Sequence, residues 1–164
     1  METCLECKDL SKRFGAVQAL EGVTLRVAPG RVVGLLGPNG SGKTTLIKLA
    51  NGLLTPTSGE IRICGALPGK ETKAVVSYLP DRPTLPEWMS AEQLMDFFAD
   101  FYADFDRDRA SDMLARLGLN PQMRYGQMSK GTREKVQLIL VMSRRAKLYL
   151  LDEPIGGVDP ATRD

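Results

Sequence analysis

The chain has 164 residues, of which 43% are hydrophobic, and this is enough for one ordinary hydrophobic core. Its 22 basic and 20 acidic residues leave a formal net charge of +2 without a long basic block, which gives no basis for nucleic-acid binding. No run approaches the roughly 18 apolar residues of a membrane span, and the N-terminal segment lacks the apolar stretch of a signal peptide. The sequence therefore predicts a soluble, intracellular protein.

Cys4 and Cys7 form a C-x-x-C pair near the N-terminus, a spacing found in zinc sites and redox motifs. The surrounding residues alternate like a β-strand, which would point side chains three positions apart to opposite faces. The chain has no second pair of this kind and no histidine. We therefore expect a structural role for this pair, and we expect Cys64 to be a strand residue.

Strand-like stretches dominate residues 2–36 and 60–79. Glycine and proline separate them at Pro29-Gly30, Pro56 and Gly59. The pattern predicts strands at residues 23–27, 31–36, 60–64 and 74–79.

The strongest chemical signal is a glycine-rich motif at residues 37–44, which reads G-x-x-x-x-G-K-[ST] between a predicted strand and a predicted helix. Such a P-loop turns its backbone N–H groups inward around phosphate oxygens, because glycine has no Cβ to obstruct the approach. Lys43 supplies a charge to the outer phosphates, and Thr44 offers a hydroxyl to Mg²⁺. The predicted binding residues of the motif are Gly37, Pro38, Asn39, Gly40, Ser41, Gly42, Lys43, Thr44 and Thr45.

Residues 90–145 have a helical pattern. Ser90 and Gln93 form a capping box that begins the first helix. An apolar stripe at helical spacing follows, and core packing explains it better than a stacking platform would. The stripe comprises Leu94, Phe97, Phe98, Phe101, Tyr102 and Phe105, and the opposite face carries Asp96, Asp100 and Asp104. A second helix is predicted at about 108–117, ending before Gly118.

The octapeptide at residues 127–134, QMSKGTRE, precedes an apolar helical run. Ser129 is a good N-cap, because its hydroxyl can accept a hydrogen bond from a free N–H group of the first turn. The same helix N-terminus could also hold an anion. The octapeptide alone is compatible with both roles.

An apolar run at residues 148–151 is typical of a strand that is buried on both faces of a parallel sheet. It places Asp152 and Glu153 at the C-terminal end of the strand, where ligands bind in open α/β sheets. Asp152 is suited to hold Mg²⁺, usually through water. Glu153 is suited to accept a proton from water that attacks a γ-phosphate.

Together, the P-loop, the octapeptide, the LYLLDEP stretch and the later GGVDP resemble the ATP-binding subunit of an ABC transporter, in the family's order and spacing. The resemblance implies that ATP brings two subunits together head to tail, as a homodimer or with a related subunit. Ser129 and Gly131 would then contact the γ-phosphate of ATP held on the other subunit. Phe14 stands where the family carries an aromatic residue that stacks on adenine.

The signature and Asp81 depart from the family pattern, whereas Asp159 matches it. The family's signature is usually Leu-Ser-Gly-Gly-Gln, and residues 128–132 keep only Ser129 and Gly131, with Lys130 adding a positive charge. Asp81 replaces a glutamine that reaches Mg²⁺ and the attacking water, although a carboxylate could still approach the metal. Asp159 matches a loop that crosses the dimer interface, and it is equally suited to cap a helix before Pro160.

We therefore expect an α/β P-loop NTPase fold with a mostly parallel sheet, an antiparallel β region and an inserted helical subdomain. The core would span about 1–81 and 144–164, and the helical subdomain about 82–143. Residues 97–110 and the basic signature resemble a bacterial subgroup that serves antibiotic or multidrug export permeases. Residues 81–89, with Trp88 as an anchor, are the expected permease contact, which would hold the subunit at the inner face of the cell membrane.

Proteins that act in DNA repair or in translation share these motifs. DNA-repair ATPases separate the P-loop from the signature by long coiled coils, and too few residues lie between Lys43 and Ser129 for one. Translation-type ABC proteins carry two cassettes in one chain. The family also carries a histidine on a later strand, and this chain has none. We therefore expect a C-terminally truncated domain that hydrolyses ATP about a hundredfold more slowly than a longer form.

Overall fold

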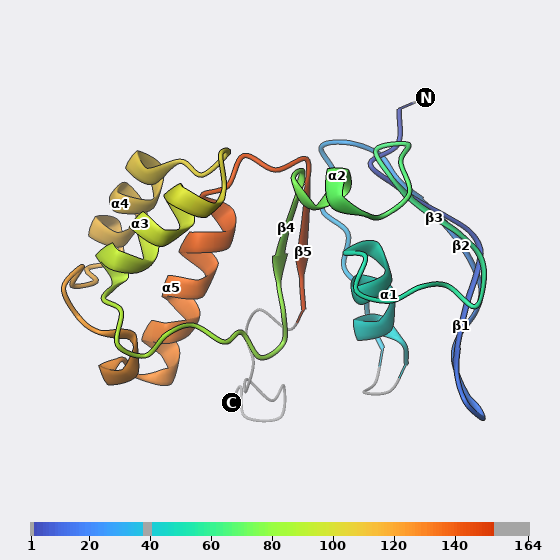
Figure 1. The fold of residues 1–164 in the computed structure, drawn as a ribbon, viewed down its shortest axis with the longest axis horizontal. Helices are drawn as coiled ribbons and strands as arrows, with labels where there is room; N and C mark the ends of the chain where they lie inside the picture. The colour runs from blue at the N-terminus through green and yellow to red at the C-terminus, as the bar shows by residue number, and fades with distance from the viewer. Residues whose placement is uncertain (1, 38–40, 153–164) are drawn as a thin grey trace. The chain divides into compact units, whose positions relative to one another are not determined.

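The computed structural model describes residues 2–37 and 41–152. The described chain forms two compact units (Figure 1). The first comprises Met1–Ser77 and Ala146–Asp152, and the second includes Tyr78–Arg145. Within the described ranges, no helix is both long and apolar enough to cross a membrane.

Three antiparallel strands form the sheet at the start of the first unit. They are β1 (Leu5–Phe14), β2 (Val17–Val27) and β3 (Ser58–Ile63), in the order β2-β1-β3. The register places Leu5 opposite both Val27 and Ile63. Alternating side chains are buried at Leu5 and Cys7 of β1 and at Ile61 and Ile63 of β3, which is the pattern of a sheet with one covered face, whereas β2 buries only Leu20. The strands predicted at 23–27 and 60–64 are confirmed, except that β3 ends at Ile63 and Cys64 has a positive φ of 50°.

Helix α1 (Lys43–Ala50) contacts β2 and β3. Its buried residues are Leu46, Ile47, Leu49 and Ala50, which lie on the side of the helix that faces the core. A short helix, α2 (Lys70–Lys73), leads toward β4 (Val76–Leu79). The predicted helix after the P-loop is therefore confirmed.

Strands β4 and β5 (Leu148–Leu151) form a two-stranded sheet. The backbone N–H groups of Lys147 and Leu148 both donate to the carbonyl oxygen of Val75, at 2.8 and 3.2 Å. The two strands thus begin side by side and run in the same direction (Figure 1). Only Leu150 of β5 is fully buried, so the prediction of a strand buried on both faces holds only in part.

The predicted strand at residues 31–36 is wrong for this structure. The segment pairs with no described strand, and Val32 and Leu36 are almost fully exposed. Its apolar residues make it suitable for the middle of a parallel sheet, where a strand is stabilised by neighbours on both sides. Without such neighbours among the described residues, the segment has no ladder of hydrogen bonds to hold it in strand geometry. Parallel pairing in the described chain is confined to β4 and β5.

The second unit is helical and contains α3 (Ala91–Phe101), α4 (Arg107–Arg116), the short 3-10 helix η1 (Tyr125–Gln127) and α5 (Lys130–Met142). Its core cluster comprises Ala91, Leu94, Met95, Ala110, Leu114, Tyr125, Met128, Val136, Ile139 and Leu140. The predicted capping box is confirmed, because Ser90 accepts from the Gln93 N–H while the Gln93 side chain accepts from the Ser90 N–H. The second predicted helix is confirmed to within a residue at each end.

The apolar stripe on α3 packs only in part as predicted. Leu94 is buried and Phe98 packs against the core, but Phe97 and Phe101 are exposed and stack on each other with ring centroids 6.1 Å apart. The stripe is wider than the face that α4 and α5 cover. Helix α3 also ends at Phe101, so Phe105 does not belong to it.

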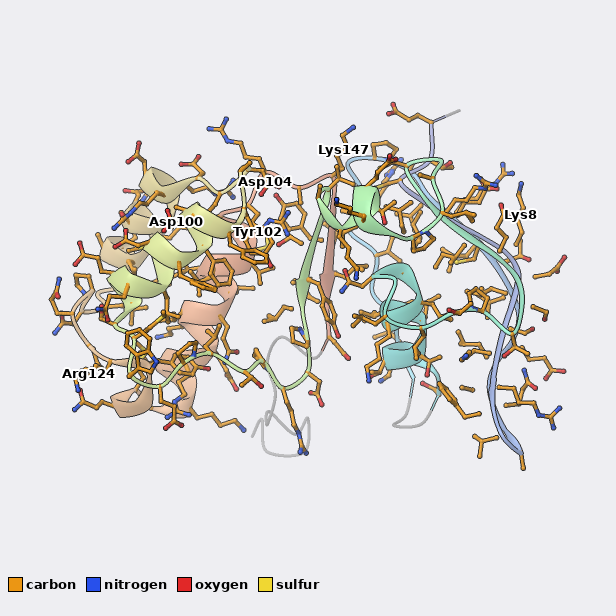
Figure 2. All side chains as sticks on the ribbon, in the orientation of Figure 1. Lys8, Asp100, Tyr102, Asp104, Arg124 and Lys147 are labelled. Carbon is orange, nitrogen blue, oxygen red and sulfur yellow. The ribbon has the colours of Figure 1, made fainter. Side chains whose placement is uncertain are left out.

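Asp104 was predicted on the outer face of that helix, and this is wrong because the helix ends before it. Asp104 instead accepts two hydrogen bonds from the buried guanidinium of Arg144, at 2.9 and 3.1 Å. The same guanidinium lies 4.0 Å from the centroid of the Tyr102 ring. Figure 2 labels Tyr102 and Asp104, which lie close together in the helical unit. This cluster joins the segment after α5 to the segment after α3.

Candidate functional site

The P-loop reaches α1 through Gly42, which is the N-cap of the helix with a φ of 92°. A Cβ at this position would lie 2.5 Å from the carbonyl oxygen of Ala19 and 2.7 Å from Cδ2 of Leu20. Both atoms belong to β2, so the loop passes directly against that strand. Only glycine tolerates this backbone conformation together with so close an approach.

Lys43 is the first residue of α1, and its ammonium donates a hydrogen bond to the carbonyl oxygen of Gly37. The lysine therefore spans the P-loop from its last residues to its first. Ser41 and Thr44 are exposed, and Thr45 is half-buried. The exposed positions leave a hydroxyl and the first N–H groups of α1 accessible to a ligand. Pro38, Asn39 and Gly40 lie outside the described residues.

Asp152 directly follows β5 and is 4% exposed. Its Oδ2 atom is buried and finds no hydrogen-bond donor among the described residues. A buried carboxylate oxygen without a partner is costly in a folded protein, since it loses its hydration without compensation. A hard cation such as Mg²⁺ prefers carboxylate and hydroxyl oxygens, so Asp152 and Thr44 have the right chemistry to hold one.

Two other acidic residues were predicted near the metal and the attacking water. Asp81 is exposed and lies two residues after β4, in the second unit. Glu153, the predicted proton acceptor, lies outside the described residues, as does Asp159.

Phe14 ends β1 and is 45% exposed, so a face of its ring is accessible. The Lys12 ammonium lies 5.1 Å from the ring centroid and donates a hydrogen bond to the carbonyl oxygen of Thr55 at 2.7 Å. The lysine is thus fixed beside the ring that was predicted to stack on adenine. Lys12 was not predicted as a site residue, although Lys12 lies two residues before Phe14 on a strand and therefore on the same face.

Ser129 caps α5, and its Oγ accepts a hydrogen bond from the Thr132 N–H at 3.2 Å. The predicted cap is therefore confirmed. Ser129, Lys130 and Gly131 are all exposed, and a Cβ on Gly131 would meet no atom within 4 Å. The start of α5 consequently presents free N–H groups and a positive dipole end to the surroundings.

Arg133 holds the segment that leads into this helix, and sequence reasoning missed it. Its guanidinium donates to the carbonyl oxygens of Tyr125 and Gly126, each at 3.1 Å, and lies 4.9 Å from the Tyr125 ring centroid. These contacts fix η1 relative to the first turn of α5. The sequence did indicate this contact, because Arg133 lies one turn after the capping Ser129 and its side chain is long enough to reach the carbonyl groups that precede the helix.

The predicted site residues thus fall into two groups. Lys43, Thr44 and Asp152 belong to the first unit, together with Phe14, while Ser129 and Gly131 belong to the second.

The sequence profile of the ABC transporter family matches residues 20–156. This chain belongs to that family and carries its ATP-binding domain. The match includes the P-loop, the α5 N-terminus and Asp152.

Individual relatives agree with this assignment. The ABC transporter ATP-binding protein YxlF of Bacillus subtilis is 32% identical over 97% of this chain and 55% of that protein. The daunorubicin resistance ATP-binding protein DrrA3 of Streptomyces coeruleorubidus is 35% identical over 99% of this chain and 54% of that protein. The chain therefore spans about half the length of these curated relatives. A solved ATP-binding subunit of an ABC transporter is 36% identical, with a TM-score of 0.83 over 96% of this chain and 69% of that one.

Proposed function

We propose that this protein is the ATP-binding and ATP-hydrolysing subunit that powers a membrane ABC transporter, and that the transporter is an exporter. The observation that carries the proposal is the buried, unpartnered carboxylate oxygen of Asp152 in the unit that also holds the P-loop. A nucleotide site needs both a phosphate cradle and an anionic metal ligand. The first unit supplies the two from separate elements, the start of α1 and the end of β5.

Each residue would have a separate task. The P-loop N–H groups and Lys43 would bind the phosphates, and Phe14 would stack on the adenine with Lys12 beside its ring. Thr44 and Asp152 would hold Mg²⁺, with Asp81 as a further candidate ligand. When bound, Mg²⁺ would neutralise charge on the outer phosphates. Glu153 would take the proton of the attacking water.

The metal assignment predicts a selective defect in the Asp152→Asn variant. ATP binding without divalent metal should be unchanged, because the P-loop is intact. The gain in affinity on adding Mg²⁺ should fall by roughly tenfold or more, the effect of losing one charged contact of about 1.5–3 kcal/mol. Calorimetric titration with ATP, in EDTA and in Mg²⁺, measures both quantities.

Asp100→Asn is a suitable control, since Asp100 is exposed on α3 in the other unit. It should leave both titrations unchanged. If Asp152→Asn retained the full Mg²⁺ effect, Asp152 would not be the metal ligand.

Ser129 and Gly131 would bind the γ-phosphate of ATP on a second subunit, so ATP would drive head-to-tail dimerisation. Ser129→Arg should leave ATP binding to the monomer nearly unchanged but abolish ATP-dependent dimers, because the added side chain would occupy the shared surface. Loss of the N-cap should lower stability by only about 1 kcal/mol. Light scattering with ATP and Mg²⁺ measures the dimers.

Ala115→Arg provides the matched control, because it adds the same bulk and charge at an exposed position of α4. That variant should dimerise like the parent chain. Normal dimers in Ser129→Arg would contradict the contact between subunits.

The permease would bind at residues 81–89, where the core passes into a helical subdomain spanning about 82–143, and would hold the subunit at the cytoplasmic face of the cell membrane. Trp88 supports this placement, because it is 64% exposed and large exposed aromatic side chains are typical anchors of protein interfaces. Export is supported by the Streptomyces relative, which is a daunorubicin resistance ATP-binding protein.

Hydrolysis by the 164-residue chain itself should be slow. The chain contains no histidine, and residues 31–36, which lead into the P-loop, pair with no described strand. A missing catalytic donor costs about a hundredfold, so turnover should be about a hundredfold slower than in a longer form that supplies the histidine. Steady-state phosphate release from both forms measures the difference, and equal rates per subunit would contradict the expectation.

A further inference from the structure

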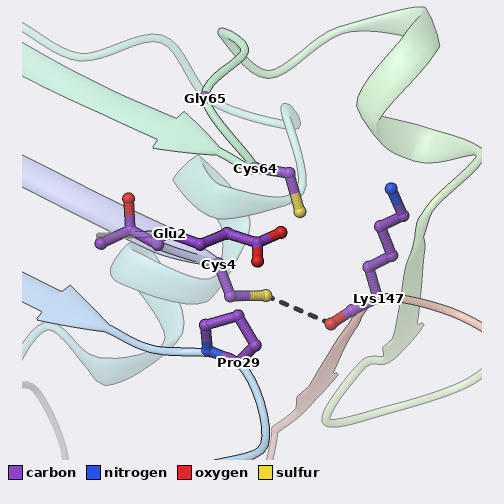
Figure 3. A pocket seen from close by; sticks show the side chains of 7 residues that line it. Glu2, Cys4, Pro29, Cys64, Gly65 and Lys147 are labelled. Carbon is purple, nitrogen blue, oxygen red and sulfur yellow. Dashed lines mark hydrogen bonds between the residues drawn. The ribbon is translucent and has the colours of Figure 1, made fainter.

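Two cysteines that are far apart in sequence meet at one end of the antiparallel sheet. Cys4 directly precedes β1, and Cys64 directly follows β3. The pairing of Leu5 with Ile63 places the two cysteines opposite each other, and the Cys64 N–H donates to the Cys4 carbonyl oxygen at 2.9 Å. Cys64 has a left-handed backbone conformation with a φ of 50°, so the direction of its side chain is set by this turn and not by the strand. Figure 3 shows both sulfur atoms directed into the same space.

That space is a cavity of about 550 Å³ within the first unit. It is lined by Glu2, Thr3, Cys4, Pro29, Cys64, Gly65 and Lys147. Cys64 is exposed, whereas Cys4 is buried and its thiol donates a hydrogen bond to the Lys147 carbonyl oxygen at 3.1 Å (Figure 3). One thiol is therefore accessible to a dissolved molecule, and the second lies behind it.

We propose that Cys64 and Cys4 form a covalent modification site for low-molecular-weight disulfides, which they convert into an intramolecular Cys4–Cys64 disulfide. The 2.9 Å hydrogen bond from the Cys64 N–H to the Cys4 carbonyl oxygen holds the two backbones together, and a disulfide requires Cα atoms about 4.4–6.8 Å apart. The cross-link therefore needs rotation of side chains rather than movement of strands.

The chemistry proceeds in two exchange steps. The Cys64 thiolate attacks one sulfur of R–S–S–R, forming Cys64–S–S–R and releasing one R–S⁻. Cys4 then loses its proton and attacks Sγ of Cys64, which breaks the mixed disulfide and releases the second R–S⁻. The external disulfide is reduced to two R–SH, the two protein thiols are oxidised to one disulfide, and their two protons go to the leaving thiolates.

The surroundings of Cys4 set the pH dependence of the second step. Burial is the main cause that raises the pKa of the Cys4 thiol to about 11, and Cys64 and Glu2 raise it further while the Lys147 ammonium opposes them. Because the thiolate is the nucleophile, closure should be slow at neutral pH and should speed up about tenfold per pH unit as the pH approaches 11.

Cys7 is the other cysteine that could pair with Cys4, and its position can be compared with that of Cys64. It lies inside β1 opposite Ile61, it is fully buried, and burial raises the pKa of its thiol to about 11. Residues three apart on a strand point to opposite faces, so Cys7 points away from the cavity. The reactive partner of Cys4 is thus Cys64, and not its neighbour in the C-x-x-C spacing.

The experiment treats the whole chain with oxidised glutathione at several pH values, blocks free thiols with iodoacetamide, and maps tryptic peptides by mass spectrometry. The expected product joins the peptide of residues 1–8 to that of residues 63–70 within one chain. Cys7→Ser should retain this cross-link. Cys4→Ser should stop at a glutathione adduct on Cys64, and Cys64→Ser should give neither adduct nor cross-link.

Several results would overturn the proposal. They include a cross-link through Cys7, a disulfide between chains as the main product, or persistence of the Cys64 adduct at pH 10 without closure. A fourth is an equal rate of cross-linking in the folded chain and in the urea-unfolded chain, because the reaction would then not depend on the fold. The outcome does not depend on nucleotide, so it is separate from the test of ATP binding.

Discussion

The Lys43→Ala variant should bind ATP about 10- to 100-fold more weakly than the parent chain while keeping its fold. The substitution removes the charge that we propose to bind the outer phosphates, and charged hydrogen bonds contribute about 1.5–3 kcal/mol. It also removes the bond from the Lys43 ammonium to the Gly37 carbonyl oxygen, so the two ends of the P-loop lose their link. Isothermal titration calorimetry gives the affinity, and far-ultraviolet circular dichroism reports the fold.

Lys48 on the same helix supplies the control. Lys48 is exposed in the last turn of α1, so replacing it with alanine removes the same kind of charge at a distance from the P-loop. Lys48→Ala should leave ATP affinity within about twofold, because single exposed charges interact weakly in water. Unchanged ATP affinity in Lys43→Ala would refute the P-loop assignment directly.

The second large effect is expected at Arg144. Its side chain is 5% exposed, forms two hydrogen bonds to Asp104 and lies against the Tyr102 ring. Arg144→Ala should lower the free energy of unfolding of the helical unit by about 3–5 kcal/mol, because it leaves the Asp104 carboxylate without its buried partner. Urea unfolding followed by circular dichroism measures the loss.

The adjacent Arg145 serves as a control, which tests whether the loss of stability comes from the burial of the ion pair or from ion pairing alone. Its side chain is 76% exposed and pairs with Asp106 at 3.1 Å. Arg145→Ala should cost about 1 kcal/mol or less, since exposed ion pairs contribute little. Equal losses in the two variants would show that the Arg144 cluster has no special role.

The sequence predicted those features that depend on local chemistry. The capping box of Ser90 and Gln93 and the cap at Ser129 are satisfied within four consecutive residues, so no knowledge of the rest of the chain is needed. Gly118 likewise ends α4 because a left-handed residue suits a helix C-terminus. The P-loop was recognisable for the same reason, since its spacing is contained in a single motif.

Features that depend on distant partners were missed. Residues 31–36 have the composition of a central strand, but a strand forms only when a neighbour supplies its hydrogen bonds. The partial burial of Phe98 and the exposure of Phe97 depend on where α4 and α5 lie, which the period of the stripe does not specify. The Arg144–Asp104 pair and the Cys4–Cys64 pair each join segments that no short pattern connects.

The pairing of β4 with β5 has a consequence for the order of events during synthesis. Strand β4 ends at Leu79 and β5 begins at Leu148, with all the helices of the second unit between them. At about 5–20 residues per second, a ribosome needs several seconds to make the intervening segment. The nascent helices can fold within that time, because local contacts form in microseconds to milliseconds. Strand β5, which leads to Asp152, is therefore made after these helices, so the P-loop exists before the carboxylate that we propose as the metal ligand.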